Sequence, residues 1–319
     1  MIGGDNLSNF AFQGSLKKKH YFEGWYYKNV TVDKQITVSI IPGVALTEED
    51  PHAFIQVIEN VHHKSYYIRY DINEVLIHHK PECIQIADNY FYEDYIDLNI
   101  QTNELVLTGF LYYSDFTRIK TSRYAPTIMG PFSYLPFMEC NHSIISMHHY
   151  IDGILFLNDQ ELDFEDGYGY IEKDYGTSFP SEYLWLQSNT LARDNLMYKK
   201  VSLFLSQATI PFKLFQFNGF IAVFTLNDKE YRFSTYQGSK CMKKITKDET
   251  EKITLKNRQY KLVLKIQPQK TMALRSPKSG KMDDEVLESL DSICQVTLYQ
   301  KKKVLFQQKL IACGYEKKK

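Results

Sequence analysis

Hydrophobic and polar residues alternate along most of the chain with a period of two, which is the pattern of half-buried β-strands. Turn signals separate the runs, and Asp152-Gly153 and Asn218-Gly219 are dipeptides that favour tight hairpins. The runs expected to form strands include residues 22–32, 36–41, 52–58, 65–70, 104–112, 140–150, 154–157, 161–164, 260–266 and 304–311. Helical spacing is rare, and residues 283–290 are the best short helix candidate. The pattern therefore predicts an all-β protein.

The length of 319 residues exceeds what one ordinary domain needs. Many strands joined by short turns are typical of a sandwich or a barrel, and this many strands indicate two of them. Phe179-Pro180 interrupts the strand pattern, because proline cannot donate to a β-ladder. We therefore expect two domains, 1–180 and 181–319.

The charge balance argues against a nucleic-acid partner. The chain has 38 basic and 38 acidic residues and a formal net charge of +0, without the basic excess that such partners need. Its five cysteines are scattered without a CxxC pair, which favours a reducing compartment over a disulfide framework. The sequence has neither a signal-peptide pattern nor an apolar run of transmembrane length. These features predict a soluble, cytoplasmic protein.

A first polar segment lies in the opening strand run, at residues 21–28. Alternation places Glu23 and Trp25 on one face of the strand and Gly24 and Tyr26 on the other. A glycine between an acid and a tryptophan indicates that something packs close to the backbone. A ligand site and a structural strand with an aromatic plug explain this segment equally well.

A second polar segment spans residues 130–143. Glu139 and Asn141 share one face of a strand there, and Cys140 and His142 share the other. One of these faces must point inward, and buried polar groups cost free energy unless they are paired or bind a ligand. A lone histidine is more often a satisfied core residue than a catalyst, but the run of neighbouring polar groups shifts the balance towards a site.

A third polar segment spans residues 167–176, where Tyr170, Glu172 and Asp174 share one face. Two carboxylates two residues apart would raise each other's pKa if they were shielded from water. That arrangement can keep one acid protonated near neutral pH. The alternative is a solvated rim from which both acids point outward. Another alternating polar face follows, which could line a cavity or face water, and consists of Trp185, Gln187 and Asn189.

Several kinds of site have no signature in the sequence. The adjacent histidine pairs at 62–63, 78–79 and 148–149 would point in opposite directions on a strand, and none has the spacing of a zinc site. Neither a glycine-rich phosphate loop nor a GxSxG nucleophile elbow occurs. We therefore expect no metal, and neither nucleotide-driven nor acyl-enzyme chemistry.

The same polar segments resemble motifs of the tocopherol cyclase family. Residues 22–26 resemble its FEGWY, residues 130–142 its GPF…MEC-x-H, residues 170–176 its YSEKNWG, and residues 183–189 its YWVQCN. Residues 274–277 are similar to its C-terminal region, so the resemblance covers nearly the whole chain. A more distant likeness reaches the carotenoid 1,2-hydratase-like proteins at residues 170–176. The chain departs from the family motif at Asp174, Tyr175 and Asn141, where the family has Asn, Trp and an apolar residue.

The resemblance implies two lipocalin-like antiparallel β-barrels packed together, with a cavity for a hydrophobic small molecule such as a prenylquinol or another isoprenoid. It implies acid-catalysed cyclisation or hydration without a cofactor. Glu172 or Asp174 would donate the proton, with Glu139 and His142 in support. The residues expected to contact the substrate are Glu23, Trp25, Tyr170, Trp185, Gln187 and Asn189, with both tryptophans facing the cation. Peripheral contact with a membrane would give access to such a substrate.

Two other hypotheses remain open from the sequence. The cavity could bind a hydrophobic molecule without reacting with it. Alternatively, the barrels could be purely structural with a closed interior, which a cavity smaller than roughly 300 Å³ would favour.

Overall fold

The computed structural model describes residues 9–135, 138–212, 215–245 and 250–318. Within these residues the regular structure is β-strand apart from three short 3-10 helices, η1 (Ile72–Glu74), η2 (Gly130–Tyr134) and η3 (Thr235–Gln237). The predicted all-β fold is confirmed. No helix in these ranges is long and apolar enough to cross a membrane. Pro136 and Phe137, part of the second polar segment, lie outside the described residues.

The first sheet is antiparallel and curls around its own core. Its strands follow the order β4 (Lys64–Asp71), β3 (His52–Glu59), β2 (Thr37–Leu46), β1 (Tyr21–Val30), β12 (Gly167–Gly176), β10 (Cys140–Leu157), β9 (Val106–Thr117), β8 (Tyr95–Gln101), β7 (Asn89–Phe91), β6 (Glu82–Ile86) and β5 (Val75–His79), with β11 (Gln160–Asp163) on β10. Tyr66 and Val75, from the two edge strands, enter the same buried cluster as Trp25. The sheet must therefore wrap around that cluster, and η1 connects its two edges.

The second sheet is built in the same way from the rest of the chain. Its strands follow the order β17 (Lys229–Ser234), β16 (Phe215–Leu226), β15 (Val201–Phe212), β13 (Tyr183–Ser188), β23 (Lys303–Lys318), β22 (Lys281–Gln300), β20 (Tyr260–Gln267), β19 (Glu251–Lys256) and β18 (Lys240–Ile245), with β14 (Thr190–Leu191) on β23 and β21 (Met272–Lys278) on β22. Phe233 and Cys241, from its two edge strands, pack on one core. The chain leaves the first sheet at Gly176 and enters the second at Tyr183, on either side of the boundary expected at residue 180.

The helix predicted for residues 283–290 is wrong, because this segment belongs to the long strand β22. β22 pairs with β21 on one side and with β23 on the other, so ladder hydrogen bonds on both edges outweigh the helical spacing of the sequence. The strand also reverses the expected burial. Leu287 is 49% exposed, whereas Glu288 is fully buried.

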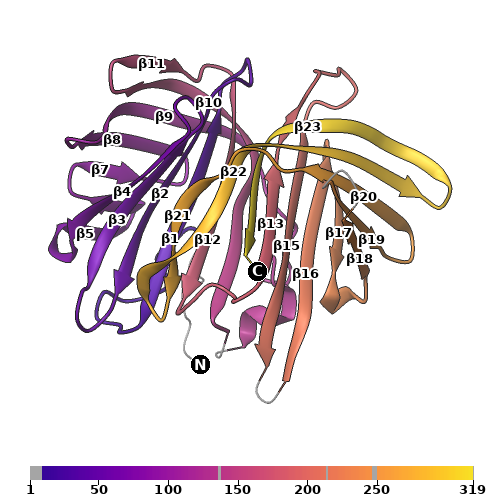
Figure 1. Cartoon of the computed structure of the whole chain (residues 1–319), viewed down its shortest axis with the longest axis horizontal. Helices are drawn as coiled ribbons and strands as arrows, with labels where there is room; N and C mark the ends of the chain where they lie inside the picture. The colour runs from indigo at the N-terminus through magenta and orange to yellow at the C-terminus, as the bar shows by residue number, and fades with distance from the viewer. Residues whose placement is uncertain (1–8, 136–137, 213–214, 246–249, 319) are drawn as a thin grey trace.

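The two sheets pack against each other through a third buried cluster, to which both contribute, including Tyr26, Phe54 and Met147 from the first and Trp185 and Phe204 from the second. Figure 1 shows the two curled sheets side by side, with β21 and the start of β22 reaching across the first sheet. Hydrogen bonds reinforce the contact. Gln56 bonds the backbone of Arg275 at 3.0 and 3.1 Å, and Ser202 Oγ donates to Met147 O at 2.5 Å. Burial of apolar surface from both sheets therefore holds the halves together.

Candidate functional site

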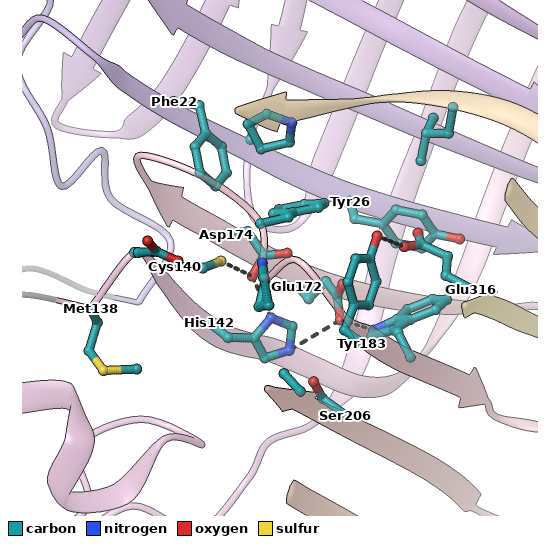
Figure 2. A pocket seen from close by; sticks show the side chains of 18 of the residues that line it. Phe22, Tyr26, Met138, Cys140, His142, Glu172, Asp174, Tyr183, Ser206 and Glu316 are labelled. Carbon is teal, nitrogen blue, oxygen red and sulfur yellow. Dashed lines mark hydrogen bonds and ion pairs between the residues drawn. The ribbon is translucent and has the colours of Figure 1, made fainter. Parts of the chain in front are cut away.

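A cavity lies between the two sheets, where the third cluster leaves space. Its walls include Phe22, Gly24 and Tyr26 of β1, Glu172 and Asp174 of β12, Cys140 and His142 of β10, Tyr183 and Trp185 of β13, Ser206 of β15 and Glu316 of β23. Figure 2 shows these side chains converging on one space. Most of the remaining lining is apolar, for example Ile41, Phe54 and Leu274. The site is therefore an apolar cavity with a polar end.

The cavity is small but open. It holds about 180 Å³ of free volume. This value lies below the roughly 300 Å³ typical of sites for drug-sized ligands. Size alone therefore favours a structural interior, whereas the open mouth lets the reacting end of a longer molecule enter.

β12 positions the acids of the site through its register with its two neighbours. Asp174 lies opposite Gly24 on β1 and His142 on β10, and Glu172 lies opposite Tyr26 in the next row. Alternation along β12 sends Tyr170, Glu172 and Asp174 to the same side, as the sequence predicted. The glycine opposite Asp174 carries no side chain, so space remains above that row.

Glu172 is buried and held by two donors on the same oxygen. Tyr170 Oη donates to Oε2 at 2.5 Å, and Trp185 Nε1 donates to Oε2 at 3.1 Å. Burial raises the pKa of Glu172 to about 7, which His142 opposes and the Asp174 carboxylate reinforces. A carboxylic acid that ionises near neutral pH can both give and take a proton under ordinary conditions.

His142 connects the two acids of β12. Its Nδ1 lies 2.5 Å from Asp174 Oδ1, its Nε2 lies 3.5 Å from Glu172 Oε2, and its ring stacks on Phe204 with centroids 5.0 Å apart. Burial by itself lowers the pKa of His142, but the carboxylates of Asp174 and Glu172 outweigh it and raise that pKa to about 9. His142 is therefore a cation at neutral pH, and Asp174 sets its orientation.

We expect Asp174→Asn to lower the pKa of His142 from about 9, because the largest contribution that opposes burial is lost and only the more distant acids, Glu172 above all, still raise it. In the wild-type protein the raised pKa of His142 stabilises the folded state below pH 6.5, and this stabilisation is lost as the pH rises through about 9. The free energy of unfolding of the variant should therefore depend less on pH in this range. NMR titration of labelled histidine rings measures the shift. His148, whose pKa burial lowers to about 4, is the internal control and should not move. An unchanged His142 titration would contradict this account.

The ligand atoms of His142, Glu172 and Asp174 lie within 4.8 Å of one another, so this cluster has the composition to hold a metal ion. In the structure His142 Nδ1 contacts Asp174, and Glu172 Oε2 accepts from Tyr170 and Trp185. Among the described residues His142 Nε2 has no hydrogen-bond partner, so it could coordinate a metal ion without losing one.

The second sheet contributes acids that sequence reasoning did not identify. Glu316 lines the cavity and accepts a hydrogen bond from Tyr183 Oη at 2.7 Å. Glu288 lies opposite it in the ladder and accepts from Tyr26 Oη at 2.5 Å. Gly314 is the sequence feature that could have pointed to these acids, because a Cβ at this position would lie 2.5 Å from Trp185 Cζ3. Gly314 lies two residues before Glu316 and marks a close approach of the Trp185 ring to the strand backbone. The sequence pattern led us to expect a contact of this kind at Gly24.

The other predicted site residues are divided between the mouth of the cavity and the sheet interface. Glu139 lines the mouth and is exposed. Gln187 and Asn189 are not among the lining residues; Gln187 Oε1 accepts from buried Lys28 at 2.9 Å, and Asn189 Nδ2 donates to Gly169 O at 2.6 Å. These two residues therefore connect the sheets. Tyr170 supports Glu172 from behind, and Trp185 lies in the wall itself.

Glu23 and Trp25 face away from the cavity, into the core of the first barrel. Trp25 Nε1 donates to Phe10 O at 2.9 Å, and Glu23 accepts from the backbone of Gln13 and Gly14 at 2.9 to 3.0 Å. Lys173 Nζ lies 3.1 Å from Glu23 Oε1, and both side chains are fully buried. The structure does not bring these two residues to the cavity; they hold the N-terminal segment against the barrel.

Comparisons with known proteins agree with this architecture. The family model described as "Tocopherol cyclase-like" matches residues 115–317. No curated protein matches the chain in sequence.

Among solved structures, a protein of Nitrosomonas europaea provisionally named AttH has a TM-score of 0.52 at 13% identity, covering 93% of this chain and 91% of its own. CghA has a TM-score of 0.55 at 8% identity, covering 93% and 87%. Kievitone hydratase from Nectria haematococca has a TM-score of 0.52 at 9% identity, covering 92% and 88%. At these identities the three structures are similar to this chain in fold alone.

Proposed function

Because the chain belongs to the tocopherol cyclase-like family, we propose that it catalyses the acid-promoted cyclisation, or hydration, of a prenylated quinol or related isoprenoid in the cavity between its sheets. The observation that carries the proposal is Glu172, a buried acid whose pKa is raised to about 7, in the wall of an apolar cavity. Proton transfer to an alkene needs such an acid, shielded from water that would compete for the cation.

The proposed step begins with a proton transfer from Glu172 to the alkene of the prenyl group. The π bond breaks, a C–H bond forms and a tertiary cation results. The phenol oxygen then forms a C–O bond to the cationic carbon and loses its proton, so the product is an isomer of the substrate. In hydration, water takes the place of the phenol. The rings of Tyr26 and Trp185, which contact edge to face at 5.3 Å, line the wall where a cation would form and would stabilise it.

The support of Glu172 suits this role. The hydrogen bonds from Tyr170 and Trp185 both reach Oε2, which leaves Oε1 to carry the proton. His142, held by Asp174, places a positive charge 3.5 Å from Oε2 and stabilises the carboxylate left after proton transfer. The apolar lining suits an isoprenoid chain, and the free volume of about 180 Å³ suits its reacting end alone.

The proposal is tested by incubating the protein with a prenylated benzoquinol and analysing the products by mass spectrometry and chromatography. Ring closure gives a chromanol of unchanged mass, and hydration adds one water. A ligand that binds and is recovered unchanged would replace the proposal with simple binding. A probe that neither binds nor reacts would favour a structural interior.

A further inference from the structure

Glu288 and Glu316 form a buried carboxyl pair in the second sheet. They lie directly opposite each other on β22 and β23, where like charges destabilise a ladder. Glu288 is fully buried, and Glu316 is 7% exposed. Among the described residues neither carboxylate forms an ion pair. Lys28, whose charge reaches Glu288, donates instead to Gln187 Oε1 and to Ala312 O.

The hydrogen bonds of the pair leave room for one shared proton. Tyr26 Oη donates to Glu288 Oε1 and itself accepts from Ser39 Oγ at 2.9 Å, while Tyr183 Oη donates to Glu316 Oε2. Glu288 Oε2 is buried and has no partner unless a proton lies on it or on Glu316. Burial raises the pKa of Glu288 well above its usual range, and burial raises that of Glu316 to about 7. The pair therefore holds one proton at neutral pH and has a vacancy for a second.

Glu316 lines the same cavity as Glu172, with Tyr183 beside it (Figure 2), and Glu288 lies behind it on the next strand. Trp185 donates to Glu172, and its ring contacts Tyr26, which donates to Glu288. The groups that surround the pair are Tyr26 and Lys28 of β1, Ser39 of β2, Glu172 and Asp174 of β12, His142 of β10 and Tyr183 and Trp185 of β13. Only Glu316 of the pair lines the cavity.

We propose that Glu316, backed by Glu288, accepts the proton that the substrate hydroxyl releases when the C–O bond forms, while Glu172 on the opposite sheet donates the proton to the alkene. This inference rests on the proposed function. One proton leaves Glu172 and forms the new C–H bond; the O–H bond breaks, and its proton goes to the Glu316 carboxylate. A solvent proton then returns to Glu172, and the pair releases its extra proton to solvent. Donor and acceptor thus lie on different walls, as the two ends of the reacting group require.

The test uses the full chain, the prenylated benzoquinol and D2O. With the wild-type protein we expect ring closure with one deuterium on the former alkene carbon. Glu316→Gln should slow ring closure by about 100-fold or more, the usual size of a general-base contribution. Deuterium should still enter recovered substrate, because Glu172 can protonate the alkene reversibly. Glu288→Leu should shift the limb of the pH–rate profile that Glu316 sets to higher pH, because the hydrogen bond with Glu288 that lowers the pKa of Glu316 is lost.

The matched control is Glu251→Gln, another buried acid of the second sheet, which pairs with Lys243 and Lys317 outside the cavity. It should close the ring at the wild-type rate, and thermal melts should show all variants folded. Closure by Glu316→Gln at the wild-type rate overturns the inference and leaves the proposed function standing. Loss of both closure and exchange in Glu316→Gln also overturns it, since Glu316 would then act in protonation. If the wild-type protein shows neither ring closure nor deuterium exchange, the proposed function fails and the inference fails with it.

Discussion

Glu172→Gln is expected to reduce turnover of a prenylated substrate by about 10²- to 10⁴-fold, the usual contribution of a positioned general acid. Glutamine keeps the shape of the side chain and can accept from Tyr170 and Trp185, but it cannot give up a proton as an acid. Because the acid must be protonated, wild-type activity should fall as pH rises above about 7. Initial rates across a pH series measure both effects.

The control for this prediction is Glu161→Gln, an exposed acid on β11, which should leave the rate unchanged. Thermal stability at pH 8 should not fall in Glu172→Gln, since the substitution removes a buried charge that the folded state disfavours. Wild-type turnover by a folded Glu172→Gln protein would remove Glu172 from the mechanism.

Glu23→Gln is expected to lower the free energy of unfolding by about 3–5 kcal/mol, the cost of leaving a buried charge without its partner. Lys173 is fully buried 3.1 Å from Glu23 and donates otherwise to Ala11 O. Tyr21 Oη also donates to Glu23 at 2.6 Å, so several groups depend on this carboxylate. Urea unfolding followed by fluorescence measures the change, because Trp25 packs beside the ion pair.

The double variant Glu23→Leu with Lys173→Met should recover part of the lost stability, since no buried charge is left unpaired. Recovery should be incomplete, because the backbone N–H groups of Gln13 and Gly14 lose their acceptor. Affinity for a hydrophobic ligand should be unchanged in folded Glu23→Gln, as this side chain does not line the cavity. A large loss of affinity without a loss of stability would return Glu23 to the ligand site.

Much of the candidate site was accessible from sequence because period-two alternation decides which residues share a face. Glu172 and Asp174 were predicted to lie together, and they do so in the cavity wall. The helix predicted for residues 283–290 was wrong, and in the strand that forms there Glu288 is buried and the neighbouring Leu287 is exposed. The hydrophobic pattern cannot anticipate this burial, since it depends on residues remote in sequence: Tyr26 donates a hydrogen bond to Glu288, and Glu316 lies opposite it in the ladder.

Local alternation was enough to predict the all-β class and the common face of Tyr170, Glu172 and Asp174. Which face of a strand meets the cavity depends instead on how the two sheets pack. β1 is buried on both faces, because one face packs into the first barrel and the other against the second sheet. Alternation alone therefore could not show whether Trp25 or Tyr26 faces the cavity. The packing of the second sheet made that choice and brought Glu288 and Glu316 to the site.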